Sequence, residues 1–177
     1  MNKKQAVFTS LWLVALIPVI IAWSMAFFGK QLQLDTKNNG ELLSETLAVP
    51  AALANQLDGK WGLVVMSEQC PQNCEQQLYR MQQLHTSLGQ DYQRLQAFWL
   101  SSKNLPVEHA DIDFNQINTI ANPQLLDWFN EQQLDWQDHS IWLIDPNGRL
   151  VIRFPPALSG KAMRADIDWL LKVSRIG

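Results

Sequence analysis

Cys70 and Cys74 are the residues best suited to chemistry, and the chain contains no other cysteine. They follow the apolar run from Trp61 to Met66, where a buried strand is expected to give way to a helix. At a helix N-terminus, unpaired backbone N–H groups and the helix dipole favour negative charge, which lowers the pKa of a thiol. Both thiols are therefore candidates for redox exchange or metal binding.

The spacing of the two cysteines bears on that choice. Within a helix, residues four apart have their Cβ atoms about 5 to 6 Å apart, whereas a relaxed disulfide needs roughly 3.5 to 4.5 Å. The pair can therefore hold a metal with little distortion. A disulfide requires the first turn to unwind or Cys70 to lie outside the helix. A chemically inert alternative is a small structural disulfide, or two buried thiols that act as small apolar side chains.

Three histidines could add a third ligand. His85 lies about 16 Å beyond the second cysteine along a helix that rises 1.5 Å per residue, so it is interpreted as a packing residue. His109 lies in an acidic segment and is most simply a solvated loop residue. His139 stands just ahead of the expected strand 141–144, whose start can meet the carboxyl end of the first strand. The residues alone leave it open as a ligand or as a loop residue.

The apolar patterns predict an α/β domain of thioredoxin-like order. The first three elements form a right-handed βαβ unit with parallel strands, and the later ones form a ββα unit around the turn Asp145-Pro146-Asn147-Gly148. In order, the expected elements are a strand over 61–66, a helix ending near Gly89, a strand over 95–100, a helix over 123–131, strands over 141–144 and 150–154, and a helix over 161–173. Cysteines at the start of the first helix are typical of the thioredoxin-like arrangement.

The N-terminal segment reads as a membrane anchor. No charged residue occurs from Gln5 to Gly29, and residues 6–28 are long enough to cross the roughly 30 Å of hydrocarbon in a bilayer. The segment fits an uncleaved anchor over residues 1–30 better than a cleaved secretory signal. Because Lys3 and Lys4 should stay in the cytoplasm, the rest of the chain is expected in a bacterial periplasm, attached to the inner membrane.

Residues 31–58 are interpreted as a tether with partial helix, and residues 59–177 as the folded domain. Hydrophobic residues make up 47% of the chain and charged residues 18%. The formal net charge of -3 provides no basic surface of the kind that binds nucleic acid.

Four motifs together resemble the Sco family of cytochrome c oxidase assembly proteins. These are Gly59-Lys60-Trp61, Cys70-Pro71 with Cys74 four residues on, Asp138-His139-Ser140, and Leu143 to Gly148. More narrowly, the chain is similar to bacterial transmembrane cytochrome oxidase-associated proteins, which share the ending Val173-Ser174-Arg175-Ile176-Gly177. The similarity covers residues 59–177 and the anchor.

The resemblance implies a membrane-anchored thioredoxin-like domain that binds copper through Cys70, Cys74 and His139 and serves the CuA centre of the oxidase. Soft thiolates select Cu(I), and imidazole suits copper as well as zinc. Asp138 is expected to orient the imidazole. The expected partners are an oxidase subunit or other assembly factors in the same membrane, and the lipid bilayer through residues 6–28.

Two alternatives remain open. One is a thiol-disulfide reductase, in which Cys70 attacks and Cys74 resolves; the lack of a proline at Gln137 to Ser140, where such oxidoreductases carry a cis-proline, disfavours it. The other is a noncatalytic scaffold whose Trp128, Trp136 and Trp142 line a partner surface, although core aromatics are the simpler interpretation. A role other than catalysis is favoured, and any enzyme activity would be thiol-disulfide exchange.

Overall fold

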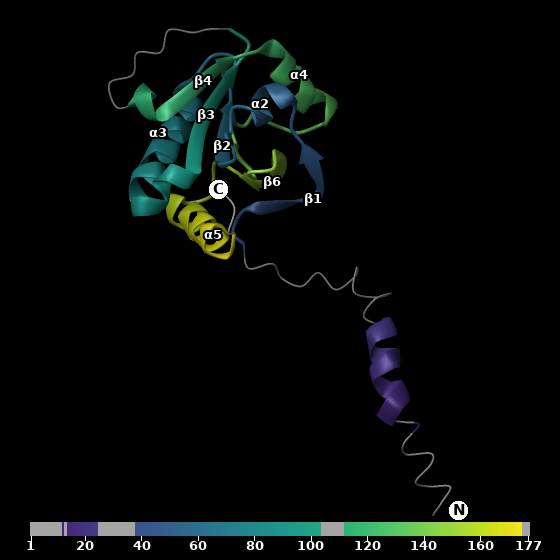
Figure 1. The fold of residues 1–177 in the computed structure, drawn as a ribbon. Coiled ribbons are helices and arrows are strands. Elements are labelled where there is room, and N and C mark those ends of the chain that lie inside the picture. Colours follow the sequence, from purple (N-terminus) through teal and green to yellow (C-terminus); the bar gives the residue numbers. More distant parts are fainter. Residues whose placement is uncertain (1–11, 13, 25–37, 104–111, 175–177) are drawn as a thin grey trace, which may run out of the picture. The chain divides into compact units, whose positions relative to one another are not determined.

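The computed structural model describes residues 12, 14–24, 38–103 and 112–174 (Figure 1). The chain divides into two units, Met1–Lys37 and Asn38–Gly177. In the first unit, residues 14–24 are helical. None of the described helices has both the length and the apolar character needed to cross a membrane. Much of the expected anchor over residues 6–28, and also His109, lies outside the described residues, so the anchor stays a prediction.

The second unit is built on a six-stranded mixed sheet with the order β1-β6-β5-β2-β3-β4. Strands β2, β3 and β4 are parallel to one another, whereas β5 runs antiparallel to β2, β6 to β5, and β1 to β6. The strands are β1 Glu41–Ala48, β2 Trp61–Met66, β3 Leu95–Ser101, β4 Ile117–Ala121, β5 Ile141–Ile144 and β6 Arg149–Phe154.

Helices cover both faces of this sheet (Figure 1). They are α2 Ala51–Ala54, α3 Gln72–Ser87, α4 Pro123–Glu131 and α5 Gly160–Val173, with short 3-10 turns at Gly89–Arg94 and Phe114–Gln116. Leu63 and Val65 of β2 pack with α3 and α5, whereas Val64 and Met66 pack with α2 and α4. Because successive side chains of a strand point to opposite faces, β2 contributes residues to two separate hydrophobic cores.

The predicted α/β order is confirmed. β2, α4 and β5 span the residues expected from the sequence, and the other predicted elements agree to within one or two residues. Local chemistry explains these boundaries: Asn122 caps α4 by accepting from Gln124 N at 3.0 Å, as short polar side chains do at helix starts. At the β5–β6 turn, Asp145 accepts from Asn147 N at 2.9 Å and from Arg149 N at 2.8 Å.

Two strands were not expected, and the first of them changes where the folded unit begins. Residues 41–48, interpreted from the sequence as tether, form β1 and pair with β6, so the compact unit starts at Asn38 rather than at Gly59. Most β1 side chains are exposed, and its pairing shifts register between Leu42 and Leu47. The expected partial helix is limited to the four residues of α2.

The start of β1 is fixed to α5 by one carboxylate. Asp166 is only 5% exposed. It accepts from Gly40 N at 2.8 Å and from Asn39 through both its backbone N at 2.8 Å and its side-chain amide at 2.7 Å. Gly40 lies so close to β6 that an added Cβ would be 2.6 Å from Ile152 Cγ2 and 2.7 Å from the Phe154 ring. The start of β1 is therefore closely packed against the rest of the domain and is not a free tether.

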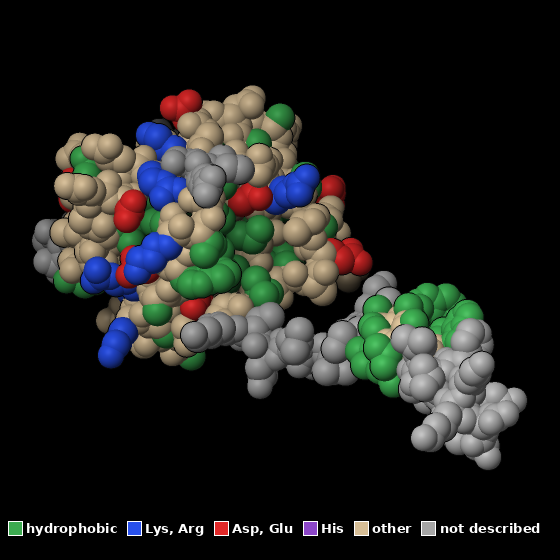
Figure 2. All heavy atoms as spheres, turned by 60° about the horizontal axis from the view of Figure 1, so that its bottom comes forward, with side chains coloured by type: hydrophobic (Ala, Val, Ile, Leu, Met, Phe, Trp, Pro, Cys, Tyr) green, Lys and Arg blue, Asp and Glu red, His purple; other side chains and the backbone are tan. Residues whose placement is uncertain are grey.

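On the face drawn in Figure 2, the acidic and basic side chains of the described residues are interspersed, and no continuous basic surface gathers there. This distribution agrees with the net charge of -3.

The fit of β1 can be tested by substituting Gly40→Ala. We expect the free energy of unfolding to fall by about 1 to 3 kcal/mol, because the added methyl group has no room against two buried side chains. Gly160→Ala is the matched control, since no atom lies within 4 Å of a Cβ added there. Denaturant unfolding measures both variants. Equal stabilities for the two would contradict the packing of β1 described here.

Candidate functional site

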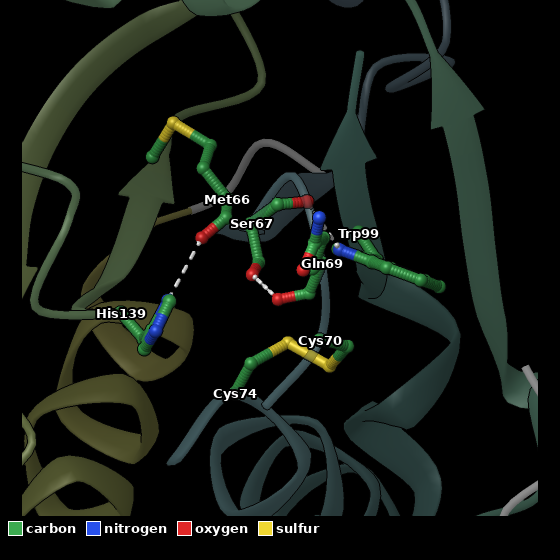
Figure 3. Close-up of a disulfide and its surroundings, with 7 residues drawn as sticks. All are labelled: Met66, Ser67, Gln69, Cys70, Cys74, Trp99 and His139. Atoms are coloured by element: carbon green, nitrogen blue, oxygen red, sulfur yellow. Dashed lines mark hydrogen bonds between the residues drawn. A yellow bond between two sulfur atoms is a disulfide. The ribbon is translucent and has the colours of Figure 1, made fainter. Parts of the chain in front are cut away.

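Cys70 and Cys74 form a disulfide with their Cα atoms 5.1 Å apart (Figure 3). Helix α3 begins at Gln72 with Pro71 as its N-cap, so Cys70 lies outside the helix. This is one of the two arrangements that the spacing requires for a disulfide. Cys74 lies in the first turn and is fully buried, whereas Cys70 is partly exposed. Cys70 is therefore the sulfur that a partner in solution can reach first.

The loop that carries Cys70 is tied to the neighbouring strand β3. Ser67 is buried, and its backbone N donates to Leu100 O at 3.0 Å. The Trp99 indole donates to Ser67 O at 3.3 Å, and the Ser67 hydroxyl donates to Gln69 O at 2.6 Å. These hydrogen bonds fix the backbone of the residues that directly follow β2. They hold the approach to Cys70 at the carboxyl end of the parallel strands.

His139 reaches the same end of β2 from a distant part of the chain. The antiparallel register pairs Leu63 with Leu143 and Val64 with Trp142, which carries the chain ahead of β5 past the end of β2. His139 Nδ1 lies 3.3 Å from Met66 O, a contact between residues 73 apart in sequence. Because a carbonyl oxygen can only accept, this contact is a hydrogen bond in the tautomer that carries its proton on Nδ1. In that neutral tautomer Nε2 keeps its lone pair.

A tight turn sets the direction of the His139 side chain. His139 has φ +61°, the left-handed region that residues other than glycine seldom adopt. Its backbone N donates to Trp136 O at 3.0 Å, and the Trp136 indole donates to Asn130 Oδ1 at 2.8 Å. Asp135 accepts from Gln137 N at 3.2 Å. The turn is thus held by bonds on both sides of Trp136.

A cavity of about 400 Å³ separates the loop after β2 from the loop before β5. Its walls come from both loops and from Asn130 of α4, and they carry polar groups and one indole. Gln69, directly before Cys70, forms part of the wall, and His139 forms another part. The lining residues are Ser67, Glu68, Gln69, Asn130, Trp136, Gln137 and His139.

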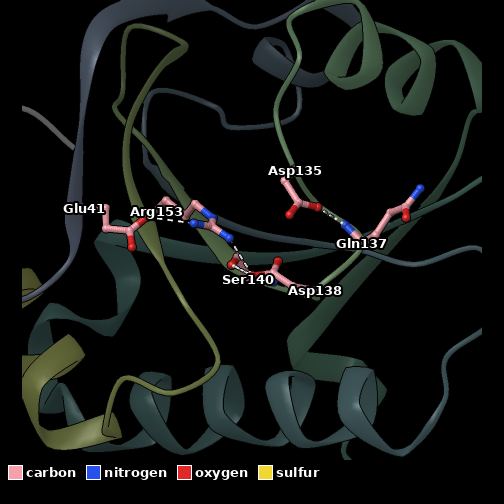
Figure 4. Close-up of polar contacts among 6 residues, drawn as sticks. All are labelled: Glu41, Asp135, Gln137, Asp138, Ser140 and Arg153. Carbon is pink, nitrogen blue, oxygen red and sulfur yellow. Dashed lines mark hydrogen bonds and ion pairs between the residues drawn. The ribbon is translucent and has the colours of Figure 1, made fainter.

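The Asp138 carboxylate contacts Ser140 and Arg153, and its expected role in orienting the imidazole stays a prediction (Figure 4). Its carboxylate accepts from Ser140 N at 2.9 Å and from the Ser140 hydroxyl at 2.8 Å, and it forms an ion pair with Arg153 at 2.5 Å. The contact to the imidazole comes from the Met66 carbonyl instead. A guanidinium is a charged donor and binds a carboxylate more strongly than a neutral imidazole N–H does. This difference explains why the Asp138 carboxylate pairs with Arg153.

Among the residues that the structure describes, no group of three or more His, Cys, Asp or Glu side chains is arranged to hold a metal ion. The two sulfurs are bonded to each other, and in that state neither can act as a thiolate ligand. The structure therefore places the Cys70–Cys74 disulfide and the His139 ring at one end of β2. The expected copper ligand set stays a prediction. The carbonyl of Met66, which contacts the imidazole, carried no signal in the sequence because any residue supplies such a group.

The other candidate residues lie in the core or at its edge. His85 of α3 is half-buried and packs edge-to-face against Tyr92, with ring centroids 5.1 Å apart. Trp136 and Trp142 are buried at 8% and 2% exposure, and Trp128 is partly buried against the same core. Packing roles are therefore confirmed for His85 and these indoles. Burial also lowers the pKa of His85.

This pKa predicts how acid affects stability. A histidine whose pKa is lower in the folded state than its ordinary value of 6.5 binds protons more readily after unfolding. Its full contribution to stability is present above pH 6.5 and is lost as the pH falls toward the lower folded value. We expect the free energy of unfolding to fall less steeply between pH 7.5 and pH 5 in His85→Gln than in the unmodified chain. Parallel pH profiles from denaturant unfolding would contradict this.

The fold and the disulfide at a strand-to-helix junction define a thioredoxin-like domain. A family model described as "transmembrane-like, thioredoxin-like, C-terminal domain" matches residues 61–174, and the chain belongs to this family. A search of curated proteins finds no match.

Solved Sco structures share this fold, which confirms the resemblance seen in the sequence. Bradyrhizobium japonicum ScoI with copper bound is 17% identical, with TM-score 0.51 over 66% of this chain and 88% of its own. Yeast Sco1 with copper bound is 18% identical, with TM-score 0.53 over 68% and 84%. Arabidopsis thaliana ScoI with copper bound is 10% identical, with TM-score 0.54 over 68% and 89%. At these identities the similarity establishes the fold.

Proposed function

We propose that this protein is a membrane-anchored Sco-like factor that carries copper for the assembly of the CuA centre of cytochrome c oxidase. Cys70, Cys74 and His139 bind the copper. The observation that carries the proposal is the meeting of the cysteine loop and the His139 ring at the carboxyl end of β2, where His139 Nδ1 lies 3.3 Å from Met66 O. Three Sco structures of the same fold are described with copper bound, which supports copper as the cargo.

Copper binding begins with reduction of the Cys70–Cys74 bond. Two electrons and two protons from a dithiol donor open the S–S bond and leave two thiols, while the donor becomes a disulfide. Each thiol loses its proton as it takes up Cu(I). Cys74 lies in the first turn of α3, where backbone N–H groups and the helix dipole stabilise its thiolate. The Nε2 lone pair of His139 completes a Cys2His set that suits copper.

Release of the cargo is assigned to the exposed side of the site. Cys70 is partly exposed and Cys74 is buried, so an incoming ligand displaces Cys70 first. The partner is an oxidase subunit or another assembly factor in the same membrane. The protein meets it on the periplasmic side of the bacterial inner membrane, to which residues 6–28 attach it. The absence of charge from Gln5 to Gly29 supports this location.

The disulfide itself favours a second candidate, thiol-disulfide exchange. In that reaction the Cys70 thiolate attacks a partner disulfide and forms a mixed disulfide, and the Cys74 thiolate then displaces the second partner thiol. The partner gains two thiols, and this chain returns to the Cys70–Cys74 disulfide. The reaction needs no imidazole ligand, so His139 separates the two candidates.

Titration of the full reduced chain in detergent with Cu(I) against a competing chelator tests the proposal. We expect one-to-one binding that weakens by about a hundredfold or more in Cys70→Ser, because a thiolate is the preferred Cu(I) ligand. We expect His139→Ala to weaken binding about tenfold, an effect of about 1.4 kcal/mol. His85→Ala is the matched control and should bind as the unmodified chain does, because its ring packs against Tyr92.

Other outcomes contradict the copper proposal. Binding that is unchanged in His139→Ala, together with measurable exchange with a disulfide substrate, would favour the reductase. Absence of both copper binding and disulfide exchange would leave a noncatalytic scaffold as the remaining interpretation.

A further inference from the structure

Arg153 of β6 joins two parts of the domain that are far apart in sequence (Figure 4). One guanidinium nitrogen lies 2.8 Å from the Glu41 carboxylate of β1, and the other lies 2.5 Å from the Asp138 carboxylate. The guanidinium carbon lies 5.8 Å from the centre of the Trp142 ring. The Arg153 Nε atom is buried and has no hydrogen-bond partner among the described residues. The side chain is thus held by its two carboxylates and by the indole.

Asp138 connects Arg153 to the turn that contains His139. Its carboxylate binds Ser140 through both the backbone N and the hydroxyl, so the residue before His139 is fastened to the residue after it. His139 itself is in the left-handed conformation, with φ +61°. A conformation of this kind is unfavourable for a non-glycine residue and persists where surrounding contacts enforce it.

We propose that Arg153 is a positioning residue for His139, and that it acts through Asp138. By fixing the Asp138 carboxylate, Arg153 keeps the turn closed and the imidazole against Met66 O. Arg153 and Asp138 have side-chain exposures of 23% and 33%, so their ion pair is less screened than one on the open surface. The inference rests on the proposed function, because the position of His139 matters to copper only if its ring is a ligand.

A purely structural role for Arg153 is the competing explanation. In that case Arg153 would serve to join β1 to β6 through Glu41, and the His139 turn would be indifferent to it. The two roles are separable because Glu41 and Asp138 bind different nitrogens of the guanidinium. Removing Glu41 leaves the pair between Arg153 and Asp138 in place.

Amide hydrogen exchange of the metal-free full chain in detergent, followed by NMR, distinguishes these roles. The amides of His139 and Ser140 donate to Trp136 O and Asp138 Oδ1. In Arg153→Gln we expect both to exchange about tenfold faster, since a charge-assisted hydrogen bond is lost. Glu41→Gln should leave both rates unchanged. Arg164→Gln is the control for loss of an arginine charge, because it removes a more exposed ion pair, to Asp168 within α5.

Unchanged rates in Arg153→Gln would overturn the inference. So would equal acceleration in Glu41→Gln, because β1 docking would then explain the effect. A Cu(I) titration of Arg153→Gln separates this inference from the proposed function. Cu(I) binding that is about three- to tenfold weaker in Arg153→Gln supports both the positioning role of Arg153 and the proposed copper function. Faster exchange with unchanged copper affinity supports the positioning role and contradicts His139 as a ligand.

Discussion

The antiparallel pairing of β5 with β2 is the constraint on which the site depends. β2 leads into the cysteine loop, and the chain reaches β5 through the turn that contains His139. Their register, with Gly62 opposite Ile144 and Val64 opposite Trp142, brings these two connections to one end of the sheet. A slip of one residue would turn every side chain of β5 to the opposite face. Gly62 also fits closely against Leu57, because a Cβ at that position would lie 2.4 Å from Leu57 Cδ2.

The rest of the domain supports this junction from three sides. Parallel pairing with β3 lets Leu100 and Trp99 hold Ser67, so the approach to Cys70 is fixed beyond the end of β2. The first turn of α3 buries Cys74 among the residues of one core. β6, paired with β5, brings Arg153 to Asp138 beside the His139 turn. The disulfide and the proposed copper site are alternative states of the same two sulfurs, so the proposal requires reduction of the pair before copper binds.

The sequence is informative where local pattern and tertiary packing agree. The apolar runs of β2 and β5 are buried at every position, and Asn122 and Asp145 form the cap and the turn that their residue types predict. β1 and β4 were missed because both lie at sheet edges with mostly exposed side chains, and Asn118 in β4 is a poor strand former. The disulfide and the nearness of His139 were foreseeable as alternatives, because spacing and strand order limit them. The Arg153–Asp138 pair was not, since it depends on the register of β6 and on the left-handed turn at His139.

The central claim is that the two sulfurs and one imidazole act on a single ion. X-ray absorption at the copper edge, recorded on the reduced full chain loaded with one equivalent of Cu(I), tests this most directly. The account predicts two sulfur scatterers and one nitrogen scatterer around the copper, with the nitrogen absent from His139→Ala and retained in His85→Ala. A spectrum with sulfur ligands alone, identical in the unmodified chain and in His139→Ala, would contradict it.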